Sequence, residues 1–177
     1  SIDLTIQAAA ERVLWGGMKL MNATGASSVW MDVNTGEVIS MVSLPDFDPN
    51  NRPRPPVQGQ AADSPLFNRA VQGVYELGST FKVFASAQAL DLGLVNPETV
   101  IDTSGPMKVG GFKIGEFNNK NYGPLSVSDI IVKSSNRGTG RLALAIGAQR
   151  QQEFLKGLGF FEPTPLEIVE AAGGKPL

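Results

Sequence analysis

The chain contains no histidine and no cysteine among its 177 residues. Without histidine, neither a Ser-His-Asp or Cys-His catalytic site nor a metal site with imidazole ligands can be built. Without cysteine, disulfides, thiolate nucleophiles and thiolate-bound zinc are excluded as well. If the protein transfers or hydrolyses acyl groups, the base that activates its nucleophile must be a lysine, a glutamate or an aspartate.

The sequence also lacks a long apolar run and any long run of one charge. Its 15 basic and 17 acidic residues give a net charge of −2, and 42% of the residues are hydrophobic. These values are typical of a globular domain and indicate neither a nucleic-acid footprint nor a polybasic membrane patch. Because the chain starts at Ser1 rather than at an initiator methionine, we expect it to be a piece of a longer protein. The lack of a signal peptide therefore says little about location.

Hydrophobic periodicity and turn residues predict a mixture of helices and paired strands. Residues 5–22 have helical apolar spacing with Thr5 as the expected cap, and Asn34-Thr35-Gly36 predicts a hairpin. The proline-rich residues 44–66 are expected to lie on the surface. The other expected elements are strands at Ser27–Asp32 and Glu37–Ser43, a helix from Ser79 to about Gly93, a strand pair within Lys108–Glu116, helices at Ser126–Lys133, Thr139–Ile146 and Ala148–Leu158, and loops from Pro163 to Leu177.

The most informative stretch is Ser79-Thr80-Phe81-Lys82, which follows Gly78 and precedes an apolar run. If Ser79 opens a helix, Ser79 and Lys82 lie on one face, because positions i and i+3 are neighbours. A serine hydroxyl needs an adjacent base to become a good nucleophile, and a desolvated lysine can lose its proton near neutral pH. On its own the pattern proves little, since roughly one Ser-x-x-Lys arises by chance in a chain of this size.

A second motif, Ser134-Ser135-Asn136, follows an apolar helix. Serine and asparagine are routine at helix ends, so this motif alone is also unremarkable. The pairing changes the interpretation, because each motif occurs once in the chain. Ser-x-x-Lys followed by Ser-x-Asn and Lys-Thr-Gly is the signature of penicillin-binding proteins and serine β-lactamases.

The resemblance extends beyond these two motifs. In order along the chain, the matching stretches are Ile2–Gln7, Met31–Val38, Asp46–Asn50, Asn68–Ala70, Gly78–Lys82 and Lys133–Asn136. Together they resemble the front part of the transpeptidase domain of a class B penicillin-binding protein, of the cell-division (septal) type. The implied fold is α+β, an antiparallel sheet with a helical subdomain, and residues 1–177 would form one partial domain.

The resemblance implies a role for each candidate residue. Ser79 would attack the carbonyl between the terminal D-alanines of a peptidoglycan stem peptide, and Lys82 would take its proton. Ser134 would relay a proton to the leaving group, while Asn136 would hold Lys82 and the substrate amide. Ser79, Ser134 and Asn136 would thus also bind substrate.

The implied setting is that of septal cell-wall synthesis. No metal or organic cofactor is implied. The implied partners are stem peptides (a D-Ala-D-Ala donor and an amine acceptor), β-lactam antibiotics, other division proteins and the remainder of the same domain. The implied location is the periplasmic face of the bacterial cytoplasmic membrane.

The sequence departs from the family pattern in two places. Leu77 stands where the family usually has proline, which should alter the loop before the helix rather than the chemistry. No Lys-Thr-Gly or Lys-Ser-Gly follows Asn136, although in the family that strand lines the cleft and supplies an oxyanion-hole N–H. Losing one such donor typically costs about 10²–10³ in rate. We therefore expect the 177-residue chain by itself to be inactive or nearly so.

Three alternatives share parts of this pattern. A β-lactamase or carboxypeptidase would use Ser79 and Lys82 but transfer the acyl group to water. A β-lactam sensor would keep the same serine and differ in the lifetime of its acyl-enzyme. A non-enzymatic scaffold for division proteins would tolerate loss of the Ser79 hydroxyl.

Overall fold

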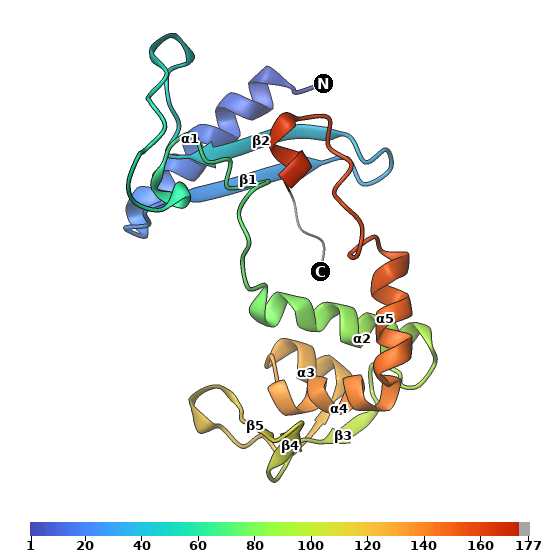
Figure 1. The fold of residues 1–177 in the computed structure, drawn as a ribbon. Coiled ribbons are helices and arrows are strands. Elements are labelled where there is room, and N and C mark those ends of the chain that lie inside the picture. Colours follow the sequence, from blue (N-terminus) through green and yellow to red (C-terminus); the bar gives the residue numbers. More distant parts are fainter. Residues whose placement is uncertain (174–177) are drawn as a thin grey trace. The chain divides into compact units, whose positions relative to one another are not determined.

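A computed structural model describes residues 1–173 of the chain, and they form two compact units (Figure 1). The first unit comprises Ser1–Tyr75 together with the tail that starts at Pro163. The second unit comprises Glu76–Glu162 and contains both sequence motifs. Each unit has its own hydrophobic core.

The first unit packs helix α1 on a two-stranded antiparallel sheet (Figure 1). Helix α1 spans Leu4–Leu20, and strands β1 and β2 span Ala26–Met31 and Val38–Leu44. The predicted hairpin is therefore confirmed, with Gly36 in the left-handed conformation at its turn. The expected cap was wrong by two residues, because Asp3 rather than Thr5 accepts the first free N–H groups of α1. The core of this unit consists of Ala10, Val42 and Leu44, flanked by Leu14, Met18 and Ala26.

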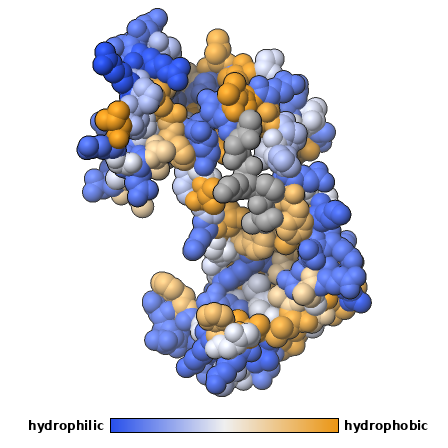
Figure 2. Space-filling view, viewed as in Figure 1, coloured by the Kyte–Doolittle hydropathy of each residue, from blue (hydrophilic) through white to orange (hydrophobic). Residues whose placement is uncertain are grey.

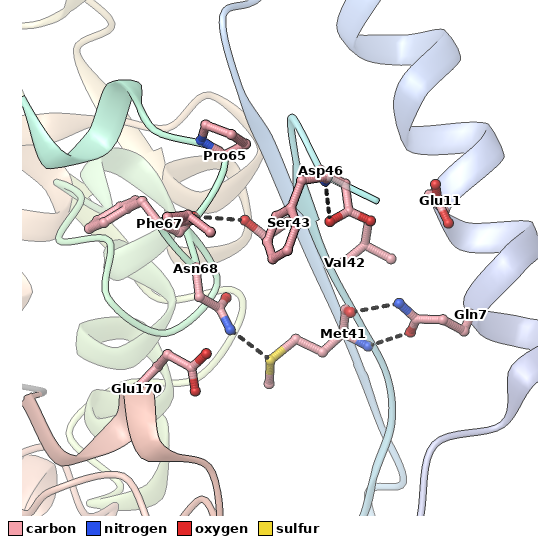
Figure 3. A pocket seen from close by; sticks show the side chains of 12 residues that line it. Gln7, Glu11, Met41, Val42, Ser43, Asp46, Pro65, Phe67, Asn68 and Glu170 are labelled. Carbon is pink, nitrogen blue, oxygen red and sulfur yellow. Dashed lines mark hydrogen bonds between the residues drawn. The ribbon is translucent and has the colours of Figure 1, made fainter. Parts of the chain in front are cut away.

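Polar side chains fix the first unit at two points. The Gln7 amide donates to Met41 O at 2.8 Å and accepts from Met41 N at 2.9 Å, which joins α1 to β2 (Figure 3). The buried Arg69 side chain donates to the carbonyls of Ala62, Ser64 and Phe67. Arg69 thus stabilises the irregular segment that precedes it, since buried carbonyls need partners. This segment and the tail contain the short 3₁₀ turns η1 (Pro49–Asn51), η2 (Ala61–Asp63) and η5 (Val169–Gly173).

The second unit is built mainly from helices that pack beside one another (Figure 1). After the 3₁₀ turn η3 (Gly78–Phe81), the helices are α2 (Lys82–Asp91), α3 (Val127–Val132), α4 (Asn136–Ile146) and α5 (Ala148–Gly157). The core gathers Ala89, Leu125, Val127, Ile130, Leu142 and Ile146. Helix α4 begins three residues earlier than predicted, because the Ser135 hydroxyl accepts from Gly138 N at 2.9 Å and caps it.

Two short strand pairs complete the second unit. Strands β4 (Met107–Val109) and β5 (Phe112–Ile114) form the hairpin expected within Lys108–Glu116. Gly110 and Gly111 both have positive φ, as a two-residue hairpin turn requires. The pairing of β3 (Val100–Asp102) with β6 (Pro124–Ser126) was not predicted. A further 3₁₀ turn, η4, spans Phe117–Asn119.

The surface of both units carries hydrophobic side chains among hydrophilic ones (Figure 2). On α1, Leu4, Leu20 and Met21 at its end are each more than three-quarters exposed. Across residues 1–173, no helix has the length and apolar character needed to cross a membrane.

Candidate active site

Lys82 is the centre of the candidate site in the second unit. As the first residue of α2, it extends its ammonium toward the turn between α3 and α4. Its Nζ donates to Ser134 O at 2.7 Å, to Ser134 Oγ at 3.0 Å and to Asn136 Oδ1 at 2.5 Å. An ammonium has three protons, so these three acceptors satisfy it completely. The structure thus brings together three of the four predicted site residues.

The turn that carries Ser134 has a strained backbone. Ser134 has φ 51°, a left-handed conformation that is uncommon for residues other than glycine. The N–H groups of Ser134 and Ser135 donate to Ile131 O and Ile130 O and end α3. Such strain persists only where the surroundings over-determine it, and it is frequent at functional sites.

Asn136 is held on both sides of its amide. Its Nδ2 donates to Gly115 O at 2.7 Å, while its Oδ1 accepts from Lys82. This orientation is chemically determined, because a backbone carbonyl can only accept and an ammonium can only donate. Asn136 therefore connects α2 to the segment that follows β5.

Glu116 is a member of the site that the sequence did not predict. Its buried carboxylate accepts from Ser135 Oγ at 2.6 Å, from Asn136 N at 2.7 Å and from Arg137 N at 3.1 Å. Glutamate occurs throughout the chain, and the only local signal was the position of Glu116 at the end of the predicted strand pair. The long-range partners could not be found from that signal.

Ser79 lies on the 3₁₀ turn η3 rather than at the start of an α-helix. The prediction that Ser79 opens the helix was therefore wrong in detail, and its side chain caps nothing. Ser79 and Lys82 are still expected to lie on one face, because residues i and i+3 of a 3₁₀ turn eclipse one another. Ser79 is exposed, and Gly78 before it has φ 57°. Within residues 1–173, no hydrogen bond joins Ser79 Oγ to Lys82.

Two opposing effects act on Lys82. Burial lowers the pKa of its amine below the ordinary 10.5, because removing water disfavours the charged form. The negative charge of Glu116 opposes this effect and raises the same pKa. The net shift is downward, which is the direction a general base requires.

An apolar cavity lies beside Lys82, which forms part of its lining. The cavity holds about 230 Å³ and is lined by Phe81, Phe84, Phe154, Leu155 and other residues of the second unit. The ring centroids of Phe81 and Phe84 lie 5.1 Å apart, and those of Phe84 and Phe160 lie 5.0 Å apart. This aromatic cluster packs the start of α2 against the segment after α5.

A second pocket, in the first unit, has different chemistry (Figure 3). It holds about 260 Å³, and the charged side chains in its lining are all acidic: Glu11, Asp46 and Glu170. Its Ser43 hydroxyl donates to Phe67 O and has no basic neighbour among the lining residues. No group of three metal-ligating side chains occurs in the part of the chain that the structure describes. The nucleophile and base motifs therefore direct attention to the second unit.

Comparison with known proteins establishes the family of the chain. A family model, the penicillin binding protein transpeptidase domain, matches residues 26–177. The chain belongs to this family. The match spans residues of both compact units, so one transpeptidase-domain model covers the α1-associated sheet and the helical unit. The α+β fold predicted from the sequence is confirmed by the transpeptidase structures that the chain resembles.

Individual transpeptidases are similar over nearly the whole chain. The probable peptidoglycan D,D-transpeptidase FtsI of Caulobacter vibrioides is 36% identical over 172 residues, which are 97% of this chain and 28% of that protein. The peptidoglycan D,D-transpeptidase FtsI of Escherichia coli K12 is 32% identical over 174 residues, 98% of this chain and 28% of that protein. These relatives confirm the predicted class B, cell-division type.

Solved structures resemble the chain over nearly its whole length. The transpeptidase domain of Burkholderia pseudomallei penicillin-binding protein 3 superimposes with a TM-score of 0.77 at 28% identity, covering 98% of this chain and 46% of that one. A peptidoglycan glycosyltransferase from Burkholderia ambifaria gives a TM-score of 0.79 at 27% identity, covering 99% and 49%. The chain thus spans just under half of these structures and about 28% of the FtsI relatives.

Proposed function

We propose that this chain carries the acylation site of a peptidoglycan D,D-transpeptidase that cross-links stem peptides during septal cell-wall synthesis. The observation that carries the proposal is the triple hydrogen bond of Lys82. It joins the Ser-x-x-Lys motif to the Ser-x-Asn motif, whose residues lie 52 and 54 positions away along the chain. Relatives named peptidoglycan D,D-transpeptidase support the same reaction class.

The hydrogen-bonding capacity of each partner favours a division of roles. When Lys82 is neutral it keeps two protons and gains one lone pair. Of its three partners, Ser134 O and Asn136 Oδ1 can only accept, whereas the Ser134 hydroxyl can either accept or donate. Ser134 is thus the partner able to exchange a proton with Lys82, and Asn136 is suited to hold the amine in place.

The proposed acylation step balances as follows. Ser79 Oγ forms a bond to the carbonyl carbon between the two D-alanines while its proton passes to neutral Lys82. The amide C–N bond then breaks, and the proton travels through Ser134 Oγ to the departing D-alanine amine. An amine of a neighbouring stem peptide later attacks the ester, releases Ser79 and completes the cross-link. A β-lactam would enter the same step and leave Ser79 acylated.

The setting of the reaction forms part of the proposal. We infer a location at the periplasmic face of the cytoplasmic membrane, where stem peptides are available, and an association with other division proteins. The family's Lys-Thr-Gly strand, absent from residues 1–177, would supply the remaining wall of the cleft.

Covalent labelling tests the proposal directly. The full-length protein that carries this chain is incubated with a fluorescent penicillin and analysed after denaturation. We expect one covalent label per protein and none after Ser79→Ala, with Ser43→Ala as a control that keeps the label. Rapid release of the label with turnover of the penicillin would instead indicate a β-lactamase, and no label would refute acylation at Ser79.

A further inference from the structure

Glu116 is a buried carboxylate with no role in the acylation step described above. It is 6% exposed and accepts three hydrogen bonds, all from residues 135–137. Two come from backbone N–H groups in the first turn of α4, where the helix dipole favours negative charge. The third comes from the Ser135 hydroxyl, which also caps that helix. Hydrogen bonds to a charged acceptor are roughly twice as strong as neutral ones.

These contacts hold Ser135, which lies between the two residues that accept from Lys82, together with Asn136 and Arg137. Ser134, with its left-handed φ of 51°, lies immediately before the residues that Glu116 binds. The backbone N–H of Asn136 donates to the Glu116 carboxylate, and its side-chain Nδ2 donates to Gly115 O. Both carbonyl and carboxylate come from consecutive residues after β5, so one short segment orients the whole Ser134–Asn136 turn.

We propose that Glu116 is a positioning residue of the transpeptidase reaction, whose carboxylate fixes the turn that presents Ser134 and Asn136 to Lys82. The inference rests on the proposed function. It assigns Glu116 no contact with substrate and no proton transfer.

The charge of Glu116 has a second consequence for the same lysine. Its field raises the pKa of Lys82 against the larger lowering effect of burial. The nearby cations are engaged elsewhere: Lys133 pairs with Asp129 at 3.7 Å, and Arg137 Nη1 donates to Thr103 O and Asn121 Oδ1. Arg141, one turn further along α4, donates to Ser104 O. Glu116 is therefore the charged group whose substitution should change the pKa of Lys82.

Two substitutions separate the shape of Glu116 from its charge. Glu116→Gln keeps the length of the side chain but removes the charge and turns an NH₂ donor toward a backbone donor. Glu116→Asp keeps the charge but is shorter by one methylene. Ser126→Ala is the matched control, since it removes the hydroxyl that caps α3 and accepts from Asp129 N at 3.0 Å, without touching Lys82 or the Ser134–Asn136 turn.

The experiment measures the rate of labelling by a fluorescent penicillin against pH in the full-length protein, with thermal unfolding recorded for each variant. We expect Glu116→Gln to slow labelling by about 10²-fold, a loss that a misplacement of catalytic groups by about 1 Å can cause. The acid limb of its pH–rate profile, where labelling slows as Lys82 becomes protonated, should move to lower pH. The reason is that the negative charge that raised the pKa of Lys82 has been removed. Glu116→Asp should slow labelling while leaving the acid limb near that of the wild type. Ser126→Ala should lower the melting temperature and leave the labelling rate of folded protein unchanged.

The labelling results distinguish the positioning role of Glu116 from the proposed transpeptidase function. Labelled wild type together with Glu116→Gln of equal rate and equal pH profile would overturn the positioning role alone. The positioning role would also be overturned if Glu116→Gln and Ser126→Ala slowed labelling equally and neither changed the pH dependence of the rate. That result would show that both variants act only through loss of folded protein. A wild-type protein that takes no label at any pH would overturn the proposed function and this inference together.

Discussion

Lys82 Nζ lies 3.0 Å from Ser134 Oγ, although the two residues are 52 positions apart in the chain. Ser134 contributes its backbone carbonyl to the same ammonium at 2.7 Å. One residue therefore supplies both a fixed acceptor and a group able to carry a proton, and its backbone is left-handed at this point.

Replacement of Lys82 by arginine should abolish acylation without removing the positive charge. A guanidinium stays protonated at all accessible pH values and cannot accept the Ser79 proton. General-base catalysis is typically worth about 10²–10⁴ in rate, so labelling by a fluorescent penicillin should fall by at least that factor. Lys133→Arg, on the exposed ion pair with Asp129, is the matched control and should label normally. Normal labelling of Lys82→Arg would exclude Lys82 as the base.

The rate of acylation should rise with pH through the pKa of Lys82. The neutral amine is the base, and the protonated form predominates below the pKa, so acid conditions should slow labelling. Because burial places this pKa below the ordinary 10.5, the rise should be complete at a lower pH than for a solvent-exposed lysine. Labelling rates measured across pH with constant ionic strength test this. A rate independent of pH would contradict the assignment.

Ser134→Ala should mainly slow acylation, whereas Ser135→Ala should mainly lower stability. The exposed Ser134 hydroxyl contacts Lys82, so its loss should slow acylation and change the melting temperature little. The buried Ser135 hydroxyl donates to Glu116 and caps α4, and its loss should destabilise the fold by about 1–3 kcal/mol. Thermal unfolding and labelling of both variants separate the two roles. Equal stability of the two variants would contradict this division.

Gly138→Ala should destabilise the second unit. A methyl group at Gly138 would lie 2.6 Å from Ile130 Cγ1, and Ile130 is fully buried in the core. Overpacking of this kind costs about 1–3 kcal/mol, which should exceed the gain of roughly 0.5–1 kcal/mol from replacing a helical glycine by alanine.

Gly16→Ala in α1 provides the matched control for this substitution. Apart from its chain neighbours and the backbone of its own helix, no atom of the described residues lies within 4 Å of the added methyl group at Gly16, so only the helical gain applies and stability should rise. Thermal unfolding of both variants would show opposite shifts. Stabilisation by both would contradict the close packing of Gly138 on Ile130.

Residues 1–177 by themselves should show little or no acylation. They contain no Lys-Thr-Gly after Asn136, and in the family that strand supplies one of two oxyanion-hole donors. The expected loss is at least about 10²–10³ in rate. The purified 177-residue chain is compared with the full-length protein at equal concentration of fluorescent penicillin, after circular dichroism has shown that it is folded. Comparable labelling of the two would refute this prediction.

Much of the local structure was accessible from the sequence. Helix α1, the β1–β2 hairpin, the β4–β5 hairpin and helices α3 and α5 follow from apolar periodicity and turn glycines, which act over a few residues. The start of α2 was misjudged, because a 3₁₀ turn and an α-helix share the same short-range pattern. The β3–β6 pairing was missed, because three-residue strands are too short to show alternation.

The sequence by itself determined the chemical inventory of the site. The absence of histidine and cysteine left lysine, glutamate and aspartate as candidate bases, and two unique motifs identified Ser79, Lys82, Ser134 and Asn136 as site candidates. Only the tertiary structure decided how three of these residues meet, and that Glu116 accepts hydrogen bonds from Ser135, Asn136 and Arg137. A buried carboxylate is stabilised by whichever donors the fold brings within about 3 Å, and here those donors lie 19 to 21 positions away. No local pattern encodes such a contact, because it depends on Gly115 and Glu116, which follow β5, lying beside the start of α4.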